Sequence, residues 1–197
     1  VVSPFRKFFN VNEVEENKIT NICNEIKDSK VFEVTDKLDG SMQSLRFYNN
    51  EYLLFGSMAL SKDESWRLTE GYGMLTQNHK RMAKENLDYT FIFESITEKD
   101  AHVVVYDKSD FGLHLIGVID VNTGYELSYL EVLEIGNLYN VKCVKMELLS
   151  FEELLEYSKI YKAGEKEGWV INIDGHRIKI KCDDYVSLHR ILDKVSS

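Results

Sequence analysis

The sequence predicts an α+β fold in which antiparallel sheets are flanked by helices. Short β-rich runs follow one another in pairs separated by turn residues, which is the pattern of antiparallel hairpins. Helical stretches separate these pairs instead of alternating with single strands, so a doubly wound parallel sheet is not expected. The chain has 197 residues, of which 44% are hydrophobic, so it can bury a sizeable core. Because Pro4 is its only proline and no linker composition divides it, we expect a single domain over 1–197.

The first predicted helix covers 12–28. Asn12 is a plausible N-cap, and Glu15 follows it at the spacing of a capping box. The apolar residues of this stretch recur at helical spacing: Ile19, Ile22, Cys23 and Ile26. β-rich runs then predict strands at 31–34, 44–48 and 52–55. Asn49-Asn50 is the expected turn between the last two, and Lys37 falls between the first two.

The rest of the chain continues this mixture of elements. A polar helical stretch covers 65–87, and a turn is expected at 122–124. Further strands are predicted at 90–96, 102–106, 113–121, 141–146, 168–173 and 176–182. Helix starts are predicted after Ser128 and Ser150, each followed by a glutamate at capping-box spacing, and at Asp183.

The composition argues against several classes of protein. No apolar run approaches the roughly 18 residues that span a bilayer, and the first residues lack the pattern of a secretory signal. Cys23, Cys143 and Cys182 are far apart, which favours reduced packing thiols over a disulfide framework or a metal site. We therefore expect a cytoplasmic protein without membrane contact. The formal net charge of -9 counts against a broadly basic surface, so any contact with nucleic acid should be local and salt-sensitive.

The stretch Lys37-Leu38-Asp39-Gly40 has the K-x-D-G spacing with which covalent nucleotidyltransferases take a nucleotide onto a lysine amine. A lysine amine attacks an α-phosphate well once its surroundings favour the neutral form, and the phosphoramidate that results can pass the nucleotide on. Gly40 would allow a close approach of backbone and nucleotide, while Asp39 could hold structure or ribose. The ordinary alternative is a charged turn between two strands.

Three later elements could complete such a site. Glu94 ends the apolar run Phe91-Ile92-Phe93, and Glu167-Gly168 opens another apolar run. Lys179 and Lys181 alternate, so both amines should project from one face of a strand and could bind an anion. Each element also has an ordinary structural explanation: a solvated glutamate, a turn before a strand, or lysines that protect a sheet edge.

Taken in this order, the elements resemble the motifs of the covalent nucleotidyltransferase superfamily. Two flanks narrow the resemblance to the phage RNA ligase 1 family, the tRNA-repair type of ATP-dependent RNA ligase. Residues 4–10, with the sequence Pro-Phe-Arg-Lys-Phe-Phe-Asn, contain a K-F-F-N element. Residues 179–189 are similar to that family's K-I-K-x-x-x-Y-V-x-L-H. The resemblance covers nearly the whole chain.

The resemblance implies a role for each of these residues. Lys37 would be the adenylylated lysine, and Glu167 the carboxylate that acts through Mg²⁺ or Mn²⁺. Residues near the nucleotide would be Lys7, Phe9, Asp39, Gly40, Glu94, Lys179, Lys181 and Tyr185. His189 is expected to pack rather than to act.

The resemblance also implies an activity and an architecture. Lys37 would take AMP from ATP, and the AMP would pass to a 5′-phosphate RNA end that a 3′-hydroxyl then seals. Broken tRNA is one RNA of this kind. The fold would be a nucleotidyltransferase (ATP-grasp-like ligase) domain around a nucleotide cleft, acting as a monomer. We expect part of the family's N-terminal segment and its C-terminal specificity domain to lie outside this chain.

One departure and two alternatives accompany this hypothesis. Met58 stands where the family has a basic residue, and Lys62 could substitute for it. One alternative keeps the lysine chemistry but uses GTP or a DNA end. The other is a degenerate ligase-like module that binds nucleotide or RNA ends without sealing them. Covalent labelling by ATP or GTP separates these possibilities.

Overall fold

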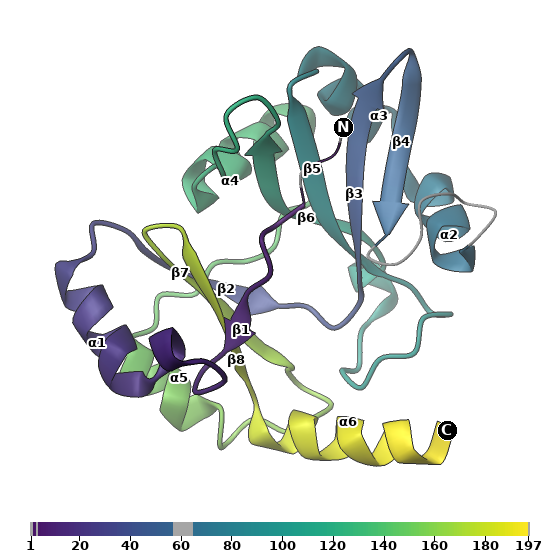
Figure 1. Ribbon diagram of the computed structural model, residues 1–197. Helices are drawn as coiled ribbons and strands as arrows, with labels where there is room; N and C mark the ends of the chain where they lie inside the picture. Colours follow the sequence, from purple (N-terminus) through teal and green to yellow (C-terminus); the bar gives the residue numbers. More distant parts are fainter. Residues whose placement is uncertain (1, 3, 57–64, 197) are drawn as a thin grey trace. The chain divides into compact units, whose positions relative to one another are not determined.

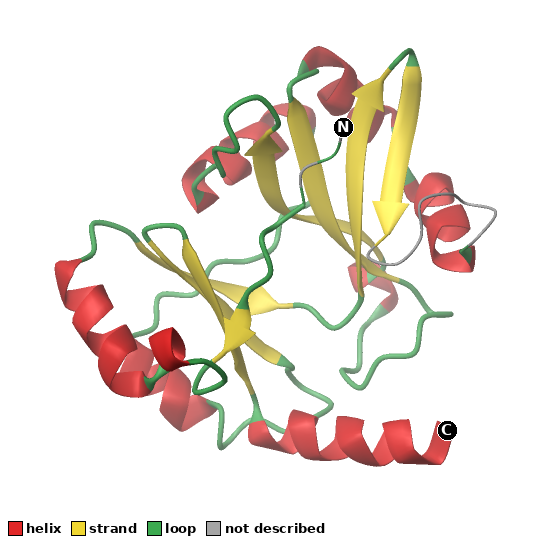
Figure 2. Ribbon diagram, viewed as in Figure 1, coloured by secondary structure: helices red, strands yellow, loops and turns green. Residues whose placement is uncertain are grey.

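The computed structural model describes residue 2, residues 4–56 and residues 65–196. Contacts divide the chain into two compact units, each built on one four-stranded sheet (Figure 1). Unit 1 comprises residues 1–5, 40–101 and 106–144. Unit 2 comprises residues 6–39, 102–105 and 145–197. Helices and antiparallel-rich sheets occur in both units, as Figure 2 shows, so the predicted α+β class is confirmed.

The sheet of unit 1 has the order β4-β3-β5-β6, and all its strands are antiparallel to their neighbours. Its strands are β3 (Ser41–Tyr48), β4 (Glu51–Gly56), β5 (Tyr89–Ile96) and β6 (Gly112–Asp120). The predicted turn at Asn49-Asn50 joins β3 to β4 with φ angles of 50° and 62°. Asparagine tolerates this left-handed conformation, which two-residue hairpin turns require.

Three helices of unit 1 pack on one face of this sheet: α2 (Trp66–Met74), α3 (Gln77–Glu85) and α4 (Tyr129–Tyr139). Alternation along the strands gives that face its apolar side chains. Leu45, Phe91 and Val118 share one row across three strands, and they join a core that also holds Leu68 of α2 and Met82 of α3. A short 3₁₀ turn, η2 (Lys108–Asp110), precedes β6.

The sheet of unit 2 has the order β1-β8-β7-β2. Its strands are β1 (Phe9–Asn10), β2 (Phe32–Lys37), β7 (Gly168–Ile173) and β8 (His176–Lys181). β1 runs parallel to β8, and the other pairs are antiparallel. Its helices are α1 (Ile19–Asp28), α5 (Phe151–Tyr157) and α6 (Asp183–Ser196), with the 3₁₀ turn η1 (Glu15–Asn17) before α1.

The two faces of this second sheet differ in chemistry. One face carries the buried residues Val34, Ile171 and Ile178 in register, and Ile22 of α1 and Leu154 of α5 are equally buried. Because side chains alternate along a strand, the next residues point the other way. That opposite face carries Thr35, Lys37, Gly168, Val170, Lys179 and Lys181. The register therefore gathers three lysines from two sequence motifs on one polar face.

Several predicted elements are confirmed by the structure. β7 coincides with the strand predicted at 168–173, and α6 begins at Asp183 as expected. Ser128 forms the predicted capping box at the start of α4. Ser150 caps α5 by accepting a hydrogen bond from the backbone N–H of Glu153.

Other predicted boundaries are wrong for identifiable reasons. The first helix begins at Ile19 and not near Asn12, because Asn12 has φ 63° and an N-cap needs an extended backbone. Lys37 is the last residue of β2 and does not lie in a loop between strands. The stretch 65–87 breaks into α2 and α3 at Leu75-Thr76, where Thr76 caps the second helix.

Two predicted strands are absent. Residues 102–106 form no ladder, because their backbone N–H groups bond to the Asp39 carboxylate and to the Gly164 carbonyl instead. Residues 141–146 make only isolated bridges, from Cys143 to β6 and from Met146 to β2. This segment leaves unit 1 after Val144, so it cannot extend a single strand.

The expected single nucleotidyltransferase domain remains a prediction. Each unit draws on three separate stretches of chain, so the division follows contacts and not a linker. Met58 and Lys62 lie outside the described residues. Among the helices that the structure describes, none is long and apolar enough to cross a membrane.

Candidate functional site

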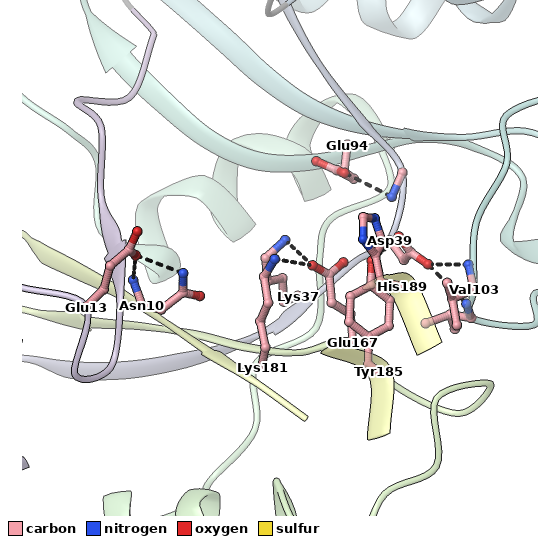
Figure 3. A network of polar contacts seen from close by, with 12 residues as sticks. Asn10, Glu13, Lys37, Asp39, Glu94, Val103, Glu167, Lys181, Tyr185 and His189 are labelled. Carbon is pink, nitrogen blue, oxygen red and sulfur yellow. Dashed lines mark hydrogen bonds and ion pairs between the residues drawn. The ribbon is translucent and has the colours of Figure 1, made fainter. Parts of the chain in front are cut away.

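Lys37 lies at the end of β2 and makes a close ion pair with Glu167. Its Nζ is 2.8 Å from Glu167 Oε1, and Lys181 Nζ approaches the same oxygen at 3.7 Å (Figure 3). The Glu167 side chain is only 5% exposed, so the protein surrounds this carboxylate almost completely. Three of the four elements noted in the sequence thus meet at one carboxylate of unit 2: Lys37, Glu167 and Lys181.

Gly168 allows strands β2 and β8 to bring Lys37 and Lys181 close to the Glu167 carboxylate. It pairs with both Lys37 on β2 and Lys181 on β8, and its φ of 151° is one that L side chains rarely adopt. A Cβ at this position would overlap the carbonyl oxygen of Ile180. The glycine after Glu167 is therefore required by the backbone, which gives the Glu-Gly pair a physical reason beyond a common turn.

The face of the unit 2 sheet that carries Lys37, Lys179 and Lys181 has more positive than negative charge. Burial lowers the pKa of Lys179, and the nearby ammonium groups of Lys37 and Lys181 lower it further. Burial raises the pKa of Glu167, and the pairing with Lys37 only partly opposes that effect. Three lysines crowded around one buried carboxylate would be stabilised by an anion, and phosphate groups supply the charge and acceptors that ammonium groups bind.

Asp39 is held by protein groups on both of its oxygens. Oδ2 accepts hydrogen bonds from the backbone N–H groups of Val103 and Val104 at 2.7 and 3.0 Å, and Oδ1 accepts one from the Tyr185 hydroxyl at 2.9 Å. Tyr185 is 3% exposed. Asp39 thus fastens the segment after Lys37 to α6 and to residues 103–104, a positioning arrangement that the sequence alone did not indicate.

Gly40 and Glu94 belong to unit 1. Glu94 Oε1 accepts a hydrogen bond from the backbone N–H of Gly40 at 3.0 Å, and a Cβ on Gly40 would overlap the carbonyl oxygen of Ser95. The end of the K-x-D-G motif is therefore packed directly on β5. Glu94 contacts this motif through Gly40.

The K-F-F-N element divides between the two faces of the unit 2 sheet. Phe9 is the register partner of Ile178 on the apolar face, and Lys7 Nζ lies 5.3 Å from the Phe9 ring centroid. Phe8 instead lies beside Lys179, whose Nζ is 5.1 Å from its ring centroid. Asn10 is the register partner of Lys179. The structure therefore brings Phe8 and Asn10 to the lysine face, and not Lys7 or Phe9.

A second ionic cluster lies behind the Lys37–Glu167 pair. Lys166 Nζ is 2.7 Å from both Asp36 Oδ1 and Glu147 Oε1, and the Trp169 indole N–H donates to Glu147 Oε2 at 2.8 Å. Asp36 directly precedes Lys37, and Lys166 directly precedes Glu167. The sequence analysis missed this cluster. The signal available in the sequence was that a residue of opposite charge directly precedes both Lys37 and Glu167.

Comparisons with known proteins agree with the geometry. A family model described as RNA ligase matches residues 1–185. A lysine-to-alanine variant of the Naegleria gruberi RNA ligase, solved with ATP and Mn, is 17% identical with a TM-score of 0.67 over 96% of this chain. An archaeal ATP-dependent RNA ligase is 12% identical with a TM-score of 0.68 over 91% of this chain.

These two structures establish similarity of fold. The chain spans 58% of the Naegleria protein and 48% of the archaeal protein. The family match, in contrast, covers nearly the whole chain and contains Lys37, Glu167, Lys179, Lys181 and Tyr185. On that match, the chain belongs to the RNA ligase family.

Proposed function

We propose that this chain is the adenylylating part of an ATP-dependent RNA ligase, with Lys37 as the nucleophile. The observation that carries the proposal is the Lys37–Glu167 ion pair on the same sheet face as Lys179 and Lys181. A nucleophilic amine, a buried carboxylate and two further cations are the groups that attack on an α-phosphate requires.

The first step is transfer of AMP to the lysine. The Lys37 ammonium must lose a proton before it attacks, and Glu167 Oε1 accepts from it at 2.8 Å. Because burial raises the pKa of Glu167, its carboxylate is a stronger base than an exposed one. The amine nitrogen then bonds to the α-phosphorus, the bond from phosphorus to the bridging oxygen breaks, and pyrophosphate leaves with the electron pair.

The second and third steps move the AMP and close the RNA strand. An oxygen of the RNA 5′-phosphate attacks the α-phosphorus, and the phosphorus–nitrogen bond to Lys37 breaks. The RNA 3′-hydroxyl then attacks the activated 5′-phosphorus, and AMP leaves. Lys179 and Lys181 would offset the negative charge that each step concentrates on phosphate oxygens.

The donor set fits a metal that arrives with the triphosphate. Among the described residues, no three His, Cys, Asp or Glu side chains gather into a metal site. Mg²⁺ is commonly held by one or two carboxylates together with substrate phosphates and water, so Glu167 would be its protein ligand here. When bound, Mg²⁺ or Mn²⁺ would supply charge neutralisation for the leaving pyrophosphate.

The remaining predicted site residues fit this proposal in different ways. Asp39 and Tyr185 would position the segment that carries Lys37, through their mutual hydrogen bond. Gly40 and Glu94 contact each other within unit 1, and the nucleotide contacts proposed for them rest on the family resemblance. The nucleotide contacts proposed for Lys7 and Phe9 rest on the family resemblance. RNA with 5′-phosphate and 3′-hydroxyl ends, including broken tRNA, is the proposed partner, and a cytoplasmic monomer is the proposed form.

Covalent labelling tests the proposal. The protein is incubated with α-labelled ATP and Mg²⁺ or Mn²⁺, and the label that survives denaturation is measured. We expect labelling of the wild type and of the exposed control Lys30→Ala, and none of Lys37→Ala. A labelled Lys37→Ala chain would exclude Lys37 as the nucleophile. Parallel reactions with labelled GTP, and with a 5′-phosphate DNA strand as acceptor, test the two alternative specificities.

A further inference from the structure

Unit 2 has a groove of about 600 Å³ beside its lysine face. Asn10 to Asn12 and Ile19 form one part of its lining, and residues from α5, β8 and α6 form the rest. The cationic side chains in this lining are Lys159, Lys179, Lys181 and Arg190. Asp183 is the one acid among the lining residues that the structure describes. The groove is thus locally basic in a chain whose formal net charge is -9.

The groove is continuous with the proposed phosphate site. Lys179 and Lys181 belong to both, while Lys159, in the turn after α5, and Arg190, on α6, extend the basic lining. Both of these outer residues are exposed, so their charges are available to a ligand. The basic residues therefore follow one another along the groove. A ligand that reacts beside Lys37 and extends into the groove would bind best if it carries negative charge at repeated positions.

The lining also suits nucleotides specifically. Tyr185 is buried, but the neighbouring His189 ring is exposed, and Ile19, Leu155 and Val186 supply apolar surface. Aromatic and apolar side chains stack on bases, while cations beside them hold the phosphates. His189 Nδ1 lies 3.0 Å from Asp193 Oδ2, so Lys159 and Arg190 are the stronger candidates for electrostatic contact with phosphates.

We propose that this groove binds the single-stranded RNA next to its reacting 5′-phosphate end, with Lys159 and Arg190 contacting backbone phosphates. The proposal rests on the function proposed above and adds a binding surface to it. Phosphate contacts carry no sequence information, so the groove should bind RNA of many sequences. Its affinity should fall steeply with salt, because each neutralised phosphate releases counterions.

Charge reversal outside the ATP-reactive cluster tests the groove. The variants are Lys159→Glu, Arg190→Glu and the double substitution, and Lys30→Glu is the control with the same change of charge outside the groove. Binding of a fluorescent 5′-phosphorylated RNA is measured by anisotropy across a salt series. We expect each groove substitution to weaken binding about three- to tenfold and to lower the salt slope by roughly one, since each removes about one phosphate contact. Lys30→Glu should change neither.

Covalent labelling with ATP keeps this test separate from that of the proposed function. The groove variants should take up AMP as the wild type does, but should transfer it to RNA with a raised KM. RNA affinity and salt slope that match the Lys30→Glu control would overturn the groove proposal, even if labelling is normal. Normal RNA binding with no labelling of the wild type would instead overturn the proposed function and leave the groove intact. Melting curves check that each variant is folded.

Discussion

Replacement of Lys166 by methionine should destabilise the protein and weaken its adenylylation. The side chain is 11% exposed and contacts two carboxylates at 2.7 Å, those of Asp36 and Glu147. Methionine keeps much of the side-chain volume but removes the cation. The two carboxylates are then left close together without a cation. Removing one partner of a buried ion pair is strongly destabilising, because the remaining charge is not compensated.

The size of the effect follows from burial. Removing one partner of a fully buried pair costs about 3–5 kcal/mol of unfolding free energy. The Asp36 and Glu147 side chains are 28% and 29% exposed, so water offsets part of that cost. We expect a loss of about 2–3 kcal/mol, since partly solvated carboxylates pay less than buried ones. For a chain of this size, that loss lowers Tm by about 4–12 °C.

Urea and thermal unfolding followed by tryptophan fluorescence measure this loss. Lys166→Arg keeps the charge and is the matched control, with a smaller expected loss. Burial lowers the pKa of Lys166, but its pairing with Asp36 and Glu147 outweighs burial and holds the pKa above the ordinary 10.5. The stabilisation is therefore complete below pH 10.5 and is lost as the pH rises through the folded pKa.

The same variant tests whether the cluster positions the site. Asp36 and Lys166 immediately precede Lys37 and Glu167, so their release should slow AMP labelling at temperatures where the variant remains folded. Lys166→Arg should recover most of the rate. A loss of less than about 0.5 kcal/mol in Lys166→Met, a change usual for surface substitutions, would show that the Lys166 ion pairs do not stabilise the fold.

Three further predictions concern the site itself. Because burial raises the pKa of Glu167, the stability of the wild type relative to Glu167→Gln should fall as pH rises from 4.5 through the raised pKa. Urea titrations of both proteins at several pH values measure this difference in unfolding free energy. A difference that grows with pH would contradict the prediction. Gly168→Ala should lower the free energy of unfolding by about 3 kcal/mol or more and abolish labelling, since its Cβ would overlap the Ile180 carbonyl. An equally stable and active variant would show that the backbone does not require glycine at this position. Tyr185→Phe removes the hydrogen bond to Asp39 and should lower the free energy of unfolding by about 1 kcal/mol. Its rate of AMP labelling, measured from timed samples, should fall by up to roughly tenfold. An unchanged rate and stability would show that Tyr185 does not position the site.

Much of the site was predictable because strand alternation is a local rule. Lys179 and Lys181 were expected on one face of a strand, and β8 places them there. The register that brings Lys37 opposite Gly168 then follows from pairing β2 with β7. Local pattern identified the strands β2, β7 and β8 that carry the site, although it did not reveal β1, and the family resemblance identified which strands carry chemistry.

The parts that could not be predicted depend on long-range contacts. The face on which Phe8 or Phe9 lies is set by the register of β1 with β8, and a shift of one residue would exchange them. The start of α1 depends on the left-handed backbone of Asn12, which capping-box spacing does not reveal. The Lys166 cluster joins residues from three separate segments, so only the folded chain displays it.

Peptide mapping of the labelled protein shows directly whether Lys37 is the residue that takes AMP from ATP. The protein is incubated with ATP and Mg²⁺, digested under conditions that preserve phosphoramidates, and analysed by mass spectrometry. We expect one AMP adduct per chain, on the peptide that contains Lys37, with one pyrophosphate released for each adduct. An adduct on another residue, or the absence of any adduct from a folded protein that binds ATP, would contradict this expectation.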